Sequence, residues 1–85
     1  MNKVVHCKKE AYDIYIGRPS KWGNPFAVGN HGTRDEVVNK YSVWILQPEQ
    51  QHLINSLHEL EGKTLGCWCK PNSCHGDVLI KLLER

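Results

Sequence analysis

The ten residues from Gly17 to Phe26 set the strongest limit on how this chain of 85 residues can fold. They contain two prolines, two glycines and an asparagine, a composition that continues neither a helix nor a strand. Regular structure must therefore stop before Gly17 and begin again after Phe26. The sequence predicts a structured loop here, with strand-like alternation before it and helical spacing after it.

Strands are expected where short β-branched and aromatic stretches alternate, at residues 4–6, 12–16 and 64–69. In the second stretch, Ile14 and Ile16 share one face and Tyr15 lies on the other.

Helices are expected in three stretches. Thr33 and Glu36 form a capping box that predicts a helix start. Its apolar face follows at helical spacing: Val37, Tyr41, Trp44 and Ile45. Pro48 ends this helix and can begin a second one that runs to Leu60. A last helix is expected from about Cys74 to Leu83. The order β-β-α-α-β-α predicts an α/β fold, a small sheet of about three strands with helices packed on it, in a single domain over residues 1–85.

Composition limits the class of protein. Hydrophobic residues make up 40% of the chain and charged residues 24%, which is typical of a soluble globular domain. No apolar run approaches the roughly 20 residues of a membrane helix, and the start of the chain lacks the apolar region of a signal peptide. We therefore expect a cytoplasmic protein. A net charge of +2 and a pI near 8.4 favour a small anionic ligand over nucleic acid.

The loop after the second expected strand carries residue types that suit a nucleotide. Arginine and lysine bind phosphate, tryptophan stacks on a base and asparagine pairs with a base edge. The candidate ligand-binding residues in this loop are Arg18, Ser20, Lys21, Trp22 and Asn24. The alternative is a rigid surface loop in which Trp22 and Phe26 fill the core.

The stretch from Cys67 to Asp77 admits two interpretations. Zinc takes three cysteines and a histidine tetrahedrally, and Cys67, Cys69, Cys74 and His75 offer that set. The spacing differs from that of common zinc fingers, however, and the adjacent Cys74 and His75 point in different directions. Without zinc, we expect no cofactor.

In the metal-free interpretation, this stretch is a strand, a turn and a helix N-terminus that binds an anion. The candidate ligand-binding residues here are Cys69, Cys74, His75, Gly76 and Asp77. The helix end is expected to lower the pKa of Cys74 and make it reactive. Asp77 either caps the helix or binds a ligand hydroxyl or amine.

Two long motifs resemble a known family. YIGRPSKWGNPF, at residues 15–26, and CWC followed by CHGD, at residues 67–77, resemble a family of small bacterial and bacteriophage proteins of unknown function. The resemblance covers nearly the whole chain. The resemblance narrows the expected fold and the expected site more than it narrows the reaction or ligand.

Both motifs follow strand ends, where open α/β sheets bind ligands, so we expect them to form one pocket. The favoured hypothesis is a pocket for a small phosphorylated, nucleotide-type ligand in a phage-type sponge that sequesters a nucleotide immune signal. A small core also favours a homo-oligomer. One alternative is an enzyme acting on a nucleotide or its glycosidic bond, with Cys74 or Cys69 as nucleophile and His75 or Asp77 as acid or base. The other is a zinc-stabilised interaction module.

Overall fold

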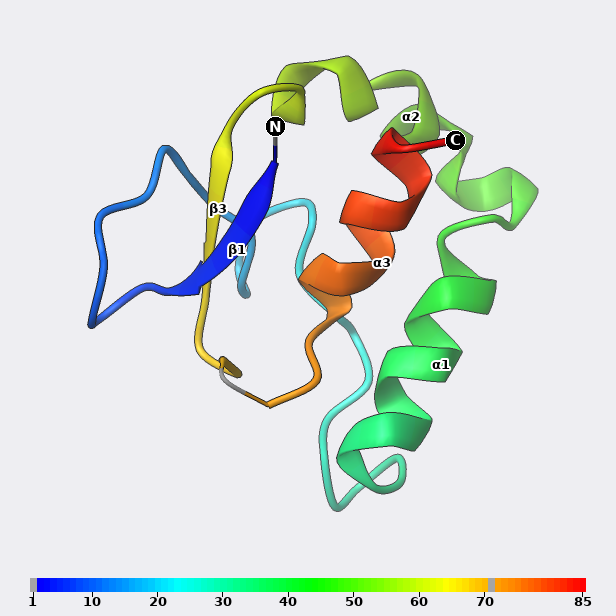
Figure 1. The fold of residues 1–85 in the computed structure, drawn as a ribbon. Helices are drawn as coiled ribbons and strands as arrows, with labels where there is room; N and C mark the ends of the chain where they lie inside the picture. The colour runs from blue at the N-terminus through cyan, green and yellow to red at the C-terminus, as the bar shows by residue number, and fades with distance from the viewer. Residues whose placement is uncertain (1, 71) are drawn as a thin grey trace.

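A computed structural model describes residues 2–70 and 72–85 and shows a small α/β fold. The elements in chain order are β1 (Lys3–His6), β2 (Ile14–Tyr15), α1 (Arg34–Trp44), the 3-10 turn η1 (Pro48–Gln50), α2 (Gln51–Asn55), the 3-10 turn η2 (Leu57–Leu60), β3 (Thr64–Cys67) and α3 (His75–Leu83). The predicted order β-β-α-α-β-α is confirmed. In Figure 1, α3 lies between the sheet and α1.

The sheet has three strands in the order β1-β3-β2, and both pairings are parallel. The last strand in sequence is therefore the central one, with Leu65 opposite Val4 on one side and Ile14 on the other. Because all strands run the same way, the segments that follow them emerge at one edge of the sheet. These segments begin at Cys7, Ile16 and Trp68.

Two expected strands are shorter than the sequence suggests. β2 covers only Ile14–Tyr15, because the chain enters the Gly- and Pro-rich loop at once. The ladder nevertheless continues through Ile16, whose N–H donates to the Gly66 carbonyl at 2.9 Å. β3 ends at Cys67, two residues before the predicted end.

The predicted second helix is divided into η1, α2 and η2. The break lies at Ser56, whose N–H donates to the Leu53 carbonyl and whose carbonyl accepts from Glu59, both with three-residue spacing. Leu53 and Leu60 are both buried on either side of this break.

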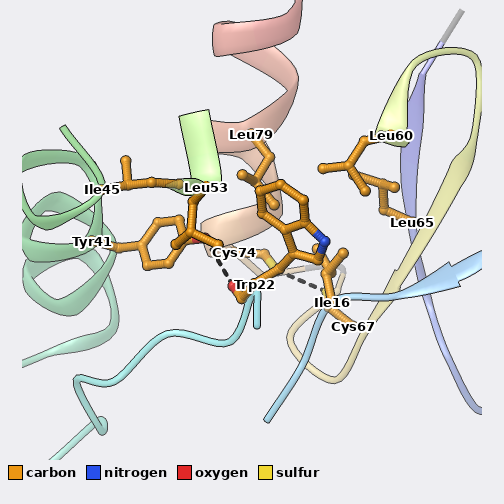
Figure 2. Close-up of a cluster of buried hydrophobic side chains, with 10 residues drawn as sticks. All are labelled: Ile16, Trp22, Tyr41, Ile45, Leu53, Leu60, Leu65, Cys67, Cys74 and Leu79. Carbon is orange, nitrogen blue, oxygen red and sulfur yellow. Dashed lines mark hydrogen bonds between the residues drawn. The ribbon is translucent and has the colours of Figure 1, made fainter. Parts of the chain in front are cut away.

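The core lies between the sheet and the helices. Figure 2 shows ten buried side chains there, and Trp22 from the loop is one of them. The Tyr41 hydroxyl donates to the Trp22 carbonyl at 2.8 Å, which ties the loop to α1. The Thr33–Glu36 capping box is present as predicted, and Val37, Tyr41 and Ile45 are buried. No helix in residues 2–70 and 72–85 is both long and apolar enough to cross a membrane.

Candidate functional site

A pocket opens at the edge of the sheet where the strands end, with a cavity of about 130 Å³. It is lined by the loop after β2, by the first two turns of α1 and by the segment between β3 and α3. The polar lining residues are Arg18, Asn24, Arg34, Cys69, Ser73 and His75. The structure therefore brings the two sequence motifs together, because β2 and β3 are parallel neighbours.

Two arginines reach this pocket from different segments. Arg18 comes from the loop and Arg34 is the first residue of α1. Within residues 2–70 and 72–85, neither guanidinium lies within ion-pair distance of a carboxylate, and none of the described lining residues is acidic. The pocket is therefore positively charged, and none of the described residues in its lining carries a negative charge to balance the two arginines.

Arg34 is a site residue that the sequence analysis missed. The signal was its position, because Thr33 is the N-cap and Arg34 occupies the first helical position. The macrodipole of a helix favours anions at that end and cations at the other. The positive charge of Arg34 is therefore unfavourable at this end of α1. An anion bound in the neighbouring pocket would offset that unfavourable interaction.

Trp22 does not line the pocket, and this corrects the expectation that it stacks on a ligand. Its side chain is only 3% exposed and belongs to the core, so no ligand ring can reach its face. The alternative of core-filling aromatic residues holds for Trp22 but not for Phe26, which lines the pocket and lies outside the core cluster. Trp68 lines the pocket instead, with 54% of its surface exposed. Strand alternation in Cys67-Trp68-Cys69 could have identified it, because Trp68 faces away from the buried Cys67.

Trp68 is held in place by its neighbours. Its indole N–H donates to the Tyr15 hydroxyl at 2.6 Å, and that hydroxyl donates to the Arg18 carbonyl at 3.2 Å. His6 packs edge-on against the indole, and the Lys8 ammonium lies 5.4 Å from its centre. A fixed, exposed indole with a cation beside it suits a planar ligand group.

Asn24 lines the pocket, but both ends of its amide already have backbone partners. Its amide nitrogen donates to the Val37 carbonyl at 3.1 Å, and its oxygen accepts from the Phe26 N–H at 2.9 Å. These bonds fasten the loop to α1. The expected recognition of a base edge is therefore replaced by a positioning role.

Lys21 and Ser20 lie outside the pocket lining. The Lys21 ammonium pairs with Glu59 at 2.8 Å and sits over the Trp22 ring, which directs it toward η2. The Ser20 backbone forms a turn with Gly17 and Gly23, and its buried hydroxyl has no partner in the described part of the chain.

The N-terminus of α3 is capped by its own side chains. The Cys74 sulfur accepts from the Gly76 N–H at 3.3 Å, and the Asp77 carboxylate accepts from the Cys74 N–H at 3.2 Å. Asp77 also pairs with Lys70 at 2.7 Å. Gly76 packs against Ile16 and Val4. These groups stabilise the helix start and leave the Gly76 N–H and the Cys74 N–H engaged, so the expected anion site on this helix end has little to offer a ligand.

His75 is the first residue of α3 and only 6% exposed, although its edge reaches the pocket. Its Nε2 lies 2.7 Å from the Ile16 carbonyl, which requires a hydrogen on Nε2. Its ring packs edge-on against Tyr41. Burial lowers the pKa of His75 and outweighs the opposing effect of the hydrogen bond to Ile16. His75 is therefore a neutral ring at pH 7.

The cysteines Cys69 and Cys74 differ in burial and in the direction in which their pKa values are shifted. Cys74 is fully buried, and the hydrogen bonding in which its thiol is the donor, together with burial, raises its pKa. This reverses the expectation of a reactive Cys74, because burial and thiol neighbours outweigh the helix end. Cys69 is half-buried and lines the pocket. Hydrogen bonds from Cys67 and Cys74, with the nearby Arg34 charge, hold the pKa of Cys69 below that of an ordinary thiol.

The sulfurs of the candidate zinc ligands Cys67 and Cys74 are not spaced for a tetrahedral zinc ion. Tetrahedral Zn–S bonds of about 2.3 Å place two sulfurs about 3.8 Å apart. The sulfurs of Cys67 and Cys74 are 2.8 Å apart and hydrogen-bonded. The His75 Nε2 donates to a carbonyl, which leaves its Nδ1, 3.8 Å from the Cys74 sulfur, as the free ring nitrogen. Among the described residues, no group of three or more His, Cys, Asp or Glu side chains is arranged to hold a metal.

Comparisons with known proteins identify relatives of unknown function. An uncharacterized protein of Acanthamoeba polyphaga mimivirus is 38% identical over 90 aligned residues, covering 85% of this chain and 67% of the viral protein. An uncharacterized 12.4 kDa protein from the nrdA-td intergenic region of Enterobacteria phage T4 is 31% identical, covering 98% of this chain and 78% of its own. No solved structure matches. Residues 2–85 match the family described as Domain of unknown function (DUF4326), and the chain belongs to that family.

Proposed function

We propose that this protein binds a small phosphorylated, nucleotide-type ligand in the pocket at the strand ends. The observation that carries the proposal is the convergence of Arg18 and Arg34 on a pocket whose described lining holds no acidic residue. Two like charges at one hollow repel each other, and a bound phosphate would attract both of them and offset that repulsion. Arginine also matches phosphate geometry with two parallel hydrogen bonds.

The size of the cavity implies that only one part of the ligand would lie inside it. Pockets that enclose a whole drug-sized ligand measure about 300–1,000 Å³. The cavity of about 130 Å³ accepts the phosphate and the group next to it. The planar base would lie outside, against the exposed face of Trp68. This arrangement gives the exposed tryptophan and the two arginines separate roles.

The proposal includes sequestration without turnover. Asp77, the expected acid or base, is paired with Lys70 and with the Cys74 N–H, outside the pocket lining. Relatives in phage T4 and in a mimivirus support a viral role, such as a sponge for a nucleotide signal of host defence. Free thiols suit the cytoplasm, where the proposal places the protein. A homo-oligomer remains part of the proposal because the core is small.

The test is isothermal titration of the purified chain with AMP, cyclic AMP, ADP-ribose and inorganic phosphate. Hydrogen bonds to charged groups contribute about 1.5–3 kcal/mol, so Arg18→Ala and Arg34→Ala should each weaken binding about ten- to hundredfold. Lys21→Ala is the matched control, because it removes a cation that pairs with Glu59 instead. Its affinity should stay within about twofold of wild type.

Two results would overturn the proposal. One is the absence of heat with every probe at millimolar concentration. The other is an equal loss of affinity in Lys21→Ala and the two pocket variants. Native mass spectrometry of the same samples reads the oligomeric state and any retained ligand.

Turnover is tested separately, by chromatography of the ligand recovered after incubation. Sequestration predicts an unchanged ligand. Cys69 is the described thiol in the pocket lining, so an enzyme would convert the ligand in wild type and leave it intact in Cys69→Ser. That result would favour the enzyme over the sponge.

A further inference from the structure

Three thiols meet beside the pocket. Cys67 ends β3, Cys69 lies two residues later and Cys74 is the N-cap of α3. The Cys67 and Cys74 sulfurs are 2.8 Å apart and joined by a hydrogen bond, which Figure 2 shows. Cys69 packs against the core cluster to which both of them belong. The parallel pairing of the sheet and the short turn before α3 create this cluster, which we call the thiol centre.

The members of the thiol centre differ in access. Cys67 and Cys74 are 1% and 0% exposed, so reagents in solution do not reach them. Cys69 is half-buried and opens into the pocket. A reagent that enters the pocket therefore meets Cys69, whereas the other two thiols lie in the core cluster against which Cys69 packs.

The surroundings of Cys69 favour its thiolate. The neighbouring thiols Cys67 and Cys74, together with the positive charge of Arg34, hold the pKa of Cys69 below that of an ordinary thiol. The pKa of each buried thiol is raised instead, first by hydrogen bonding with the neighbouring thiols and then by burial, so both favour the protonated form. The centre therefore combines one accessible nucleophile with two protonated thiols within reach.

We infer that Cys69 is the reactive thiol of a redox centre that reduces hydroperoxides and closes an intrachain disulfide. This inference goes beyond the proposed function and does not depend on the identity of the pocket ligand.

The proposed reaction has two steps. The Cys69 thiolate attacks one peroxide oxygen, the O–O bond breaks, and the products are a sulfenic acid and hydroxide or alkoxide. A buried thiol, Cys67 or Cys74, then attacks the Cys69 sulfur. An S–S bond forms, the sulfenic oxygen leaves as water and the thiol proton neutralises it. The two cysteines are oxidised by two electrons, and the peroxide is reduced by two. Exchange with the third thiol can move the disulfide to the Cys67–Cys74 pair, whose sulfurs already touch.

Cys7 is the internal control. It is free and half-buried like Cys69, but it lies in the segment after β1 and makes no hydrogen bond to another thiol in the described part of the chain. A difference in reactivity between Cys69 and Cys7 therefore reports the effect of the thiol centre rather than exposure alone.

The first test measures alkylation of the reduced wild-type chain by iodoacetamide at neutral pH, with each cysteine read by peptide mass spectrometry. Cys69 should react about tenfold faster than Cys7 or more, since the thiolate is the reacting form. Equal rates for the two cysteines would overturn the inference. One zinc ion per chain in the native mass would overturn it too, because the thiols would then be ligands.

The second test adds stoichiometric hydrogen peroxide to the reduced chain. The intact mass should fall by about two hydrogen masses, and digestion should locate the disulfide within the thiol centre. Cys7→Ser should behave like wild type, and Cys69→Ser should lose the rapid phase. Circular dichroism checks that both variants fold. Oxidation that proceeds equally in Cys69→Ser, or that only links two chains through Cys7, would contradict the inference.

Discussion

At the scale of single residues, burial decides which expected site residues remain available to a ligand. His75 illustrates this, because the sequence favours a ligand contact and the fold turns the ring into a core group. Its Nε2 hydrogen bond to Ile16 joins α3 to the loop after β2. The ring therefore holds one wall of the pocket in place.

The neutral state of His75 makes stability depend on pH. The unfolded chain protonates His75 near its ordinary pKa of 6.5, whereas the folded chain has a lowered pKa and binds the proton only at lower pH. Its contribution is therefore complete above about pH 6.5 and is lost as the pH falls from there to the folded pKa. The unfolding free energy should fall by at most about 1.4 kcal/mol per pH unit in this interval.

Denaturant unfolding between pH 7.5 and 5 checks this slope, at roughly half-unit steps. His75→Gln keeps a hydrogen-bond donor and removes the titration, so its slope should be smaller than that of wild type. His52→Gln, at an exposed position on α2, should keep the wild-type slope. An unchanged slope in His75→Gln would contradict the neutral buried ring.

At the scale of elements, the packing of α3 on the sheet depends on Gly76. A Cβ at this position would lie 2.8 Å from the Ile16 side chain and 2.9 Å from the Val4 side chain. In an open helix, alanine gains up to about 1 kcal/mol over glycine. Overpacking costs about 1–3 kcal/mol, and this cost is the larger of the two here because Ile16 is a core side chain and Val4 packs against the core.

Gly76→Ala should therefore lower the unfolding free energy by about 1–2 kcal/mol, measured by urea unfolding. Lys81→Ala, on the exposed side of α3, should change it by less than about 0.5 kcal/mol. A stabilised Gly76→Ala variant would show that α3 does not approach the sheet as closely as described.

At the scale of the whole molecule, stability rests on the central strand. Leu65 is fully buried in β3, with β1 and β2 on its two sides. Truncating a buried leucine costs about 2–5 kcal/mol, a large share of the stability of a small domain. Leu65→Ala should therefore unfold at much lower urea concentration than wild type, or fail to fold.

The matched control is Leu46→Ala, because Leu46 is 48% exposed after α1. Its unfolding free energy should change by less than about 0.5 kcal/mol. Similar midpoints for the two variants would contradict the position of β3 at the centre of the sheet.

Local signals made most of the fold predictable. The Thr33–Glu36 capping box acts within one turn, so it can be recognised from spacing alone, and the helix it predicts is present. The alternation around Ile14 and Ile16 and the strand at Thr64 are likewise local. The division of the predicted second helix was not predictable, because its apolar spacing fits both α and 3-10 winding.

The candidate site was predictable in its location and only partly in its members. Arg18, Asn24, Cys69 and His75 line the pocket as expected. Trp22 and Lys21 do not, because a tryptophan beside a cation has the same sequence pattern whether it faces a ligand or the core. Arg34 and Trp68 reach the pocket from segments that are distant in sequence.

The sequence by itself determined the element order, the structured loop and the presence of both motifs at strand ends, since these depend on backbone preferences of neighbouring residues. Only the tertiary structure decided which arginines share a pocket, which tryptophan stays exposed and which cysteine is accessible. Those properties depend on burial and on contacts between distant segments. The parallel placement of β3 between β1 and β2 creates them.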